Sequence, residues 1–264
     1  MKKLQGQSKV INNFFNVKKY NDDYYKVVYF KYPIDNFQDE GKERKRDVNE
    51  IKLKESISRS RSTIFEYSMC NEFEYFVTLT LDKKKYDRYD LDAYIKDLGQ
   101  YIRNLRRKYK ADIQYLLIPE LHKDGAWHLH GLIRGLPLED LKAFKIGDKI
   151  PQRLKKMIKE GKEIFNWLTY AEKFGWVTLE RVRSQTAVSK YITKYISKDI
   201  ETVQLERKNK KLYYCSRGLK KAEKVKEGTM SANTAPGLER FKTFENDYLI
   251  TYELNSKEYT NLFT

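Results

Sequence analysis

Alternating and helical patterns of hydrophobic residues follow one another through the middle of the chain. Phe73–Leu81 is rich in β-branched and aromatic residues and predicts a strand. Leu91–Tyr109 carries apolar residues at helical spacing and predicts a helix. Gln114–Leu121 and Trp127–Arg134 predict two more strands, and the short polar segment that separates them predicts a hairpin loop.

The pattern continues with a second helix and a fourth strand. Residues 138–160 predict a helix, in which Pro151 breaks or restarts the pattern. Trp176–Val182 predicts a strand, and Ala187–Ile200 predicts another helix. The order β-α-β-β-α-β, followed by a helix, is that of a ferredoxin-like sandwich. The sequence therefore predicts an α+β fold of this RRM-like type, with a central antiparallel sheet.

Weaker patterns flank this region on both sides. Tyr24–Tyr32 alternates as a strand does, Asp39–Arg46 has the composition of a linker, and Asp47 is placed to cap a long basic helix. In the tail, Lys211–Ser216 and Asp247–Leu254 have strand character. We therefore expect an N-terminal extension, a central domain that begins with the basic helix 47–70, and a basic C-terminal extension, over residues 1–46, 47–200 and 201–264.

The charge balance narrows the class of partner. The 264 residues contain 53 Lys and Arg against 37 Asp and Glu, which gives a net charge of +16. This excess favours a polyanion, with nucleic acid ahead of an anionic membrane surface. No apolar run is long enough to span a membrane, and Met1–Val10 lacks the apolar core of a signal peptide. Cys70 and Cys215 form neither a metal-binding spacing nor a disulfide framework, so we expect a reducing cytoplasm.

Two histidines on one predicted strand are candidate metal ligands. His128 and His130 are two residues apart, so both point to the same face, while Leu129 points to the other. An isolated pair of this kind more often lies at a surface without a metal, but the chain has only three histidines, all within nine residues. Two imidazoles and one carboxylate suit Mn²⁺ or Mg²⁺ with water, and also Zn²⁺.

The third ligand depends on the hairpin loop. If the loop has three residues and ends in a left-handed Gly125, Glu120 lies directly opposite His128 and points to the same face. Glu120 is then the favoured ligand, and His122 on that face is the reserve. A two-residue turn at Asp124–Gly125 would instead reverse the side-chain directions and remove Glu120 from the site.

Candidate nucleophiles lie on the last predicted helix. Tyr191, Lys194, Tyr195 and Lys198 form one stripe at helical spacing. A phenol with a pKa near 10 is a weak nucleophile at neutral pH, and nearby ammonium groups favour its phenolate and neutralise a phosphate under attack. Most of the 21 tyrosines must simply cover the core, and only the regular spacing sets these two apart.

Three segments in this order resemble the HUH-type rolling-circle replication initiators. Phe76–Thr80 is similar to their first motif, Trp127–Ile133 to the second, and Tyr191–Lys198 to the third. The position of Glu120 is similar to the acidic ligand of the geminivirus type. The paired tyrosines look like the microvirus and filamentous-phage branch, which plasmid initiators also resemble. Together the motifs span Phe73–Asp199, about half of the chain.

The resemblance implies a metal-dependent endonuclease and strand transferase. It would nick single-stranded DNA at a replication origin, keep the 5′ end on a tyrosine, leave a free 3′-hydroxyl as primer and rejoin the strands at termination. Tyr191 and Tyr195 would then exchange strands, with Tyr195 slightly favoured for the first cut. No nucleotide-binding loop of the type G-x-x-x-x-G-K-[ST] occurs, so a host helicase and polymerase in the bacterial cytoplasm would be needed, without a membrane.

Other polar and aromatic residues have softer assignments. Thr78 and Thr80 share a strand face with Phe76, and their hydroxyls are candidates for DNA contact, although β-branched residues also fill strands without such a role. Trp167 and Trp176 are expected in the core. Basic residues on the predicted helices are candidates for contact with the DNA backbone, although a solvated helix face explains them equally well: Arg59, Arg61, Arg106 and Arg107.

Two alternative functions remain open at this stage. A single-strand transposase or a relaxase would use the same chemistry. Such transposases are usually shorter with one tyrosine, and relaxases usually place the tyrosine before the histidines. A non-enzymatic RRM-like protein that binds nucleic acid is the other alternative, but the aromatic-rich strand motif of that class is missing. A covalent adduct with an origin oligonucleotide would separate the enzymes from the binder.

Overall fold

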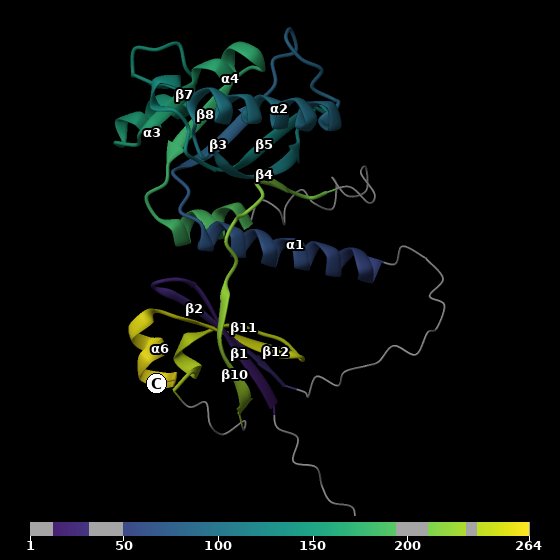
Figure 1. Cartoon of the computed structure of the whole chain (residues 1–264), viewed down its shortest axis with the longest axis vertical. Helices are drawn as coiled ribbons and strands as arrows, with labels where there is room; N and C mark the ends of the chain where they lie inside the picture. The colour runs from purple at the N-terminus through teal and green to yellow at the C-terminus, as the bar shows by residue number, and fades with distance from the viewer. Residues whose placement is uncertain (1–12, 32–49, 194–210, 231–236, 264) are drawn as a thin grey trace, which may run out of the picture. The chain divides into compact units, whose positions relative to one another are not determined.

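The computed structural model describes residues 13–31, 50–193, 211–230 and 237–263. The chain divides into two compact units, one of residues Val48–Lys220 and one that combines Met1–Asp47 with Lys221–Thr264 (Figure 1). Each unit has its own sheet and its own apolar core. Among the described residues, no helix combines the length and the apolar character needed to span a membrane.

The larger unit is built on a seven-stranded antiparallel sheet in the order β6-β7-β8-β3-β5-β4-β9. Its inner order β8-β3-β5-β4 is that of a ferredoxin-like β-α-β-β-α-β unit, so the predicted α+β fold is confirmed. The strands are β3 (Tyr75–Thr80), β4 (Gln114–Leu121), β5 (Trp127–Arg134), β6 (Leu141–Ala143), β7 (Ile164–Trp167), β8 (Val177–Arg181) and β9 (Tyr214–Cys215).

One face of this sheet is covered by α2 (Leu91–Tyr109), together with the short helix α4 (Leu168–Lys173). The helix α2 begins where the Asp90 carboxylate accepts a hydrogen bond from Ala93 N, and it ends at Lys110 in the left-handed conformation. Its apolar stripe packs on alternate residues of β3 and β5. The residues in this core include Leu98, Ile102, Val77, Leu79 and Leu129.

The opposite face receives α1 (Glu50–Cys70) and the helical residues 185–193. The apolar contacts of these helices are concentrated at one end of the strands, where Ile64 and Ile192 pack with Leu132. At the other end, the same face carries polar side chains. The sheet therefore buries one face along its whole length and leaves part of the second for chemistry.

The expected helix over residues 138–160 is wrong in its first half. The chain forms a single 3-10 turn (Leu138–Asp140) and then β6, and a helix begins only after Pro151, as α3 (Gln152–Lys159). The buried Asp140 carboxylate accepts hydrogen bonds from Trp167 Nε1 at 2.8 Å and Thr169 N at 3.0 Å. These bonds join segments almost 30 residues apart, so local periodicity does not reveal them.

The smaller unit is a five-stranded antiparallel sheet in the order β10-β1-β2-β12-β11. Strands from both ends of the chain therefore alternate in one sheet. Tyr25 stacks on Tyr259 of the last helix, with 4.3 Å between ring centroids. The elements are β1 (Asn13–Asn21), β2 (Tyr24–Phe30), β10 (Glu223–Met230), η3 (Glu239–Phe241), β11 (Lys242–Glu245), β12 (Leu249–Leu254) and α6 (Ser256–Phe263).

The predicted strands at residues 24–32, 211–216 and 247–254 all occur, with shorter bounds. The basic helix predicted over residues 47–70 is α1, which begins at Glu50. The expected linker Asp39–Arg46 and the expected cap Asp47 lie outside the described residues.

Candidate functional site

The hairpin between β4 and β5 has the register that places a carboxylate beside the histidines. Its loop consists of Lys123–Gly125, closed by a hydrogen bond from His122 N to Ala126 O, and Gly125 has a φ of 81°. Glu120 and His128 are register partners across the hairpin. The three-residue loop and the pairing expected from it are confirmed, and the two-residue turn is excluded.

Two cross-strand rows carry the candidate site on the face away from α2. In the first row, Thr80 pairs with His128, which pairs with Glu120. In the second row, one step along the strands, Thr78 pairs with His130. Because directly paired residues of an antiparallel sheet project to the same side, these side chains gather on one face.

Both imidazole rings are held by threonine hydroxyls. The Oγ1 atom of Thr78 lies 3.1 Å from His130 Nδ1, and Thr80 Oγ1 lies 3.1 Å from His128 Nδ1. A hydroxyl that accepts a hydrogen from Nδ1 leaves Nε2 as the basic nitrogen of the ring. This is the arrangement in which metal-binding histidines usually occur, with the second ring nitrogen held by an outer partner. The two threonines, predicted as DNA contacts, therefore position the histidines.

The ionisation of the cluster suits a cation. The Glu120 carboxylate contacts His130 Nε2, and this hydrogen bond lowers the pKa of Glu120, against the opposing effect of burial. Burial, and then the nearby His122 and His130, lower the pKa of His128 and favour its neutral form. Carboxylate and neutral imidazole are the forms that bind a metal.

The donor set of Glu120, His128 and His130 fits a divalent cation, since one carboxylate and two imidazoles share one face. Their present side-chain contacts are with each other and with His122, whose ring centroid lies 5.1 Å from that of His128. Among the described residues, no group of three or more His, Cys, Asp or Glu side chains is placed to hold a metal ion. The ion therefore belongs to the proposal below.

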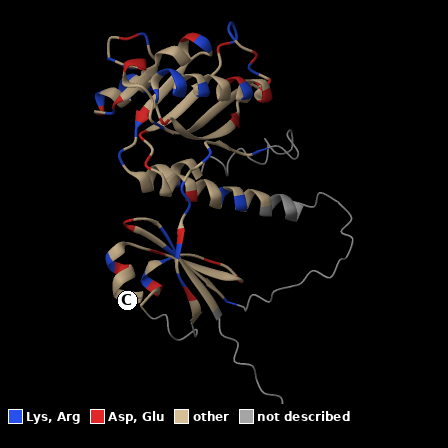
Figure 2. Ribbon diagram, in the orientation of Figure 1, with Lys and Arg blue, Asp and Glu red and all other residues tan. Residues whose placement is uncertain are grey.

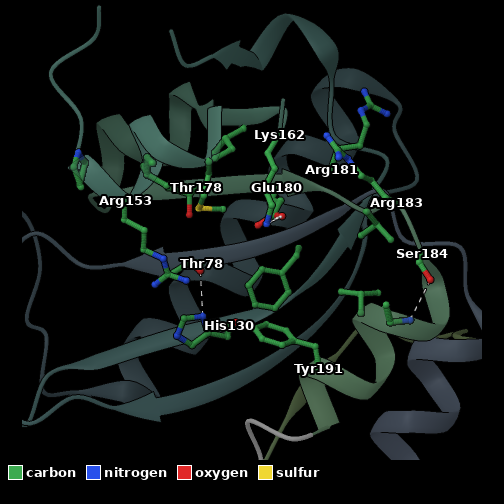
Figure 3. A pocket seen from close by; sticks show the side chains of 18 of the residues that line it. Thr78, His130, Arg153, Lys162, Thr178, Glu180, Arg181, Arg183, Ser184 and Tyr191 are labelled. Carbon is green, nitrogen blue, oxygen red and sulfur yellow. Dashed lines mark hydrogen bonds and ion pairs between the residues drawn. The ribbon is translucent and has the colours of Figure 1, made fainter. Parts of the chain in front are cut away.

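Tyr191 lies over the same sheet face as the histidines. Ile192 is fully buried and anchors the helical residues 185–193, which leaves the Tyr191 side chain 40% exposed. The Phe76 ring packs against both Tyr191 and His130, with centroid distances of 5.3 and 6.1 Å, and Figure 3 shows both side chains at the edge of one pocket. The other predicted residues of this stripe lie outside the described residues: Lys194, Tyr195 and Lys198.

The arginines on α2 lie away from the histidine face. Arg106 donates hydrogen bonds to the carbonyl of Ile113 and, at 3.1 Å, to Ser216 Oγ, which ties α2 to the sheet edge. Arg107 donates to Asn104 Oδ1 of its own helix at 3.0 Å. Both belong to the helix that covers the opposite face, so the structure does not bring them to the candidate site.

The arginines on α1 belong to the layer that covers the histidine face. Arg59 is exposed, and Arg61 is partly buried. They remain candidates for contact with a polyanion, at a distance from the histidine rows that no contact bridges among the described residues.

Sequence reasoning missed a pocket of about 760 Å³ that opens beside His130 and Tyr191. It lies under α3, in the region where a continuous helix was expected. Trp167 is fully buried, as predicted, but the prediction of a core position for Trp176 is wrong, because its side chain is 40% exposed and lines the pocket. A tryptophan at the start of a strand carries no local sign of whether neighbouring segments will cover it.

Comparison with known proteins gives one family. Residues 74–200 match the model of a family described as Replication-associated protein, of the ORF2 type. The match contains both histidine rows, the pocket-lining part of β8 and the whole tyrosine stripe. No curated protein and no solved structure gives a significant match.

Proposed function

Because residues 74–200 match the replication-associated protein family, we propose that the protein initiates rolling-circle replication by nicking single-stranded origin DNA with a tyrosine. The observation that supports this most directly is the shared contact of Phe76 with Tyr191 and His130. It brings a partly exposed phenol and a histidine of the candidate metal cluster to one place, as attack on a metal-bound phosphodiester requires.

The chemistry follows from these groups. The Tyr191 phenolic oxygen attacks the phosphorus and forms a 5′-phosphotyrosyl bond, while the bond from phosphorus to the 3′-oxygen breaks. The phenol loses its proton to solvent, and the released 3′-oxygen takes one up as a primer hydroxyl. Glu120, His128 and His130 would hold Mn²⁺ or Mg²⁺, which supplies polarisation of the phosphoryl oxygens.

A second tyrosine allows joining as well as cutting. Tyr195 follows Tyr191 by four residues, and in the proposed cycle one phenol keeps the 5′ end while the other attacks the regenerated junction. Lys194 and Lys198 would stabilise whichever phenolate leaves. In this proposal, the partners are origin DNA and a host helicase and polymerase in the cytoplasm of a bacterial cell.

The tyrosine assignment is tested with Tyr191→Phe and Tyr195→Phe, alone and together. An oligonucleotide with an origin-like site, labelled at the 5′ or the 3′ end, is incubated with Mn²⁺ and separated under denaturing conditions. Each single variant should cleave once at most, and the double variant should form no covalent adduct. Tyr248→Phe, an exposed tyrosine of the smaller unit, is the matched control. An adduct in the double variant, mapped to another tyrosine, would refute the assignment.

The metal cluster is tested separately with His128→Ala combined with His130→Ala. We expect this variant to lose cleavage in Mn²⁺ or Mg²⁺ while it keeps its fold and most of its non-specific DNA affinity, since neither imidazole carries much of the positive charge. Nicking by the double variant would place the metal elsewhere. Reversible DNA binding without any adduct in the wild type would instead support the non-enzymatic binder.

A further inference from the structure

Beyond the histidines and Tyr191, the pocket extends under α3 and along β8. Its walls combine apolar side chains, such as Leu154 and Met157 of α3, with basic ones, such as Arg153. Arg153 extends from α3 toward Thr78 and His130 (Figure 3). A hollow of about 760 Å³ with apolar walls and a few cations has the size and character of a ligand site.

Trp176 occupies a defined position relative to the candidate metal cluster. Its carbonyl accepts a hydrogen bond from Thr80 N at 2.9 Å, and Val177 pairs with Leu79, so Trp176 continues the cross-strand row of Thr80, His128 and Glu120. With strands about 4.8 Å apart, Trp176 stands about 10 Å from His128 along this row.

The preceding Gly175 makes this position possible. Its φ is 146°, and a Cβ atom here would lie 2.4 Å from Asp82 N, so no other residue could pass β3 as closely. The backbone that presents Trp176 is therefore held against the end of β3, which is rigid sheet rather than mobile loop.

The indole ring of Trp176 is arranged as a stacking platform. Phe144 supports it in a nearly parallel arrangement, with 5.5 Å between centroids and 23° between planes, while the side chain remains 40% exposed. Exposed aromatic rings beside a basic groove bind unpaired bases by stacking, and they do so with little regard to sequence.

The charges around the ring complement a phosphate chain. The eight residues of α3 include four basic ones and no acidic one (Figure 2). Lys149 and Lys155 line a second hollow of about 330 Å³ that shares Trp176 with the first. In the part of the chain that the structure describes, no carboxylate pairs with Arg153, Lys149 or Lys155, whereas Lys162 is neutralised by Glu180 at 2.8 Å.

We propose that this pocket binds an unpaired nucleotide of the DNA strand that is cut, with its base stacked on Trp176 and the adjoining phosphates held by Arg153, Lys149 and Lys155. The inference rests on the proposed function, since it is the nicking reaction that calls for a flanking nucleotide about 10 Å from the histidines. The pocket would hold the strand in place and align the scissile phosphate with Tyr191.

Tryptophan fluorescence reports this contact directly. Trp127 and Trp167 are 5% and 0% exposed, so Trp176 is the one tryptophan of the three that a base can reach. A short oligothymidylate is titrated into the full chain in the presence of EDTA, and tryptophan emission and anisotropy of the labelled oligonucleotide are followed together. Saturable quenching with the same midpoint as the anisotropy change is the expected result.

Variants separate stacking from charge. Trp176→Leu should weaken binding about 5- to 100-fold, and Trp176→Phe should restore most of the affinity because it keeps an aromatic face. Arg153→Gln should weaken binding and reduce the salt dependence by about one phosphate contact. Arg103→Gln, on an exposed position of α2, removes the same charge on the opposite face and should change affinity far less. Thermal unfolding checks that each variant is folded.

The pocket assignment is overturned if the wild type binds oligothymidylate without quenching, or if folded Trp176→Leu binds as tightly as the wild type. Because the assay contains no divalent cation, its result does not depend on cleavage. Quenching in a protein that forms no tyrosyl adduct would sustain the pocket and refute only the proposed nicking reaction.

Discussion

The threonines behind the histidines allow a sharp test of the candidate metal cluster. In Thr78→Val combined with Thr80→Val, each side chain keeps its branched shape and loses only the hydroxyl that lies 3.1 Å from a histidine Nδ1. The rings of His128 and His130 then lose the partners that set their orientation and tautomer. We expect a large fall in Mn²⁺ affinity with little change in fold.

The size of the effect can be worked from these two contacts. Loss of one outer hydrogen-bond partner of a metal ligand typically lowers metal affinity about 10- to 100-fold. The two sites share one ion and do not add independently, so we expect about 100-fold for the pair, or about 2.7 kcal/mol. Each neutral hydrogen bond contributes about 1 kcal/mol to folding, so the free energy of unfolding should fall by only about 1–2 kcal/mol.

The assay is titration of Mn²⁺, followed by calorimetry or by the electron paramagnetic resonance signal of free Mn²⁺, with urea unfolding in parallel. Thr251→Val is the matched control, since this buried strand threonine bonds to Thr243 at 3.2 Å in the smaller unit. Its Mn²⁺ affinity should equal that of the wild type. If the double variant also binds Mn²⁺ as the wild type does, the threonines do not support a metal site, and the reasoning from His128 and His130 fails.

Three further predictions concern stability and charge. Asp140→Ala should lower the free energy of unfolding by about 3–5 kcal/mol in urea, because it leaves Trp167 Nε1 and Thr169 N buried without an acceptor; an unchanged midpoint would contradict this. Gly131→Ala should cost more than about 2 kcal/mol, since its Cβ would lie 2.2 Å from the Leu116 carbonyl oxygen, and a stable variant would show that β4 can move. DNA affinity should fall steeply with salt, and a flat response would argue against phosphate contacts by the net charge of +16.

The sequence by itself determined those parts of the protein that depend on near neighbours. The apolar stripe of Leu91–Tyr109 specified a helix that buries one face, and the structure has that helix with the same bounds. The register of the β4–β5 hairpin followed from a three-residue loop and one glycine, because shifting the pairing by a single residue would exchange the two faces of the strand. Glu120 and His128 could therefore be paired before any tertiary contact was known.

Only the tertiary structure decided which segments distant in sequence meet. The turn at Asp140 replaces the expected helix because its carboxylate finds donors on Trp167 and Thr169, and no local period encodes that meeting. In the smaller unit, β1 pairs with β10 and β2 with β12, which joins expected extensions from opposite ends of the chain.

The same reason explains what the sequence could not say about the candidate site. Thr78 and Thr80 were placed on the correct face, but their bonds to the histidine rings depend on which strand lies beside β3. Trp176 had the composition of a core residue and became a pocket wall, because exposure is set by what the rest of the chain leaves uncovered. A pattern specifies the direction of a side chain, while packing against remote segments decides what that side chain touches.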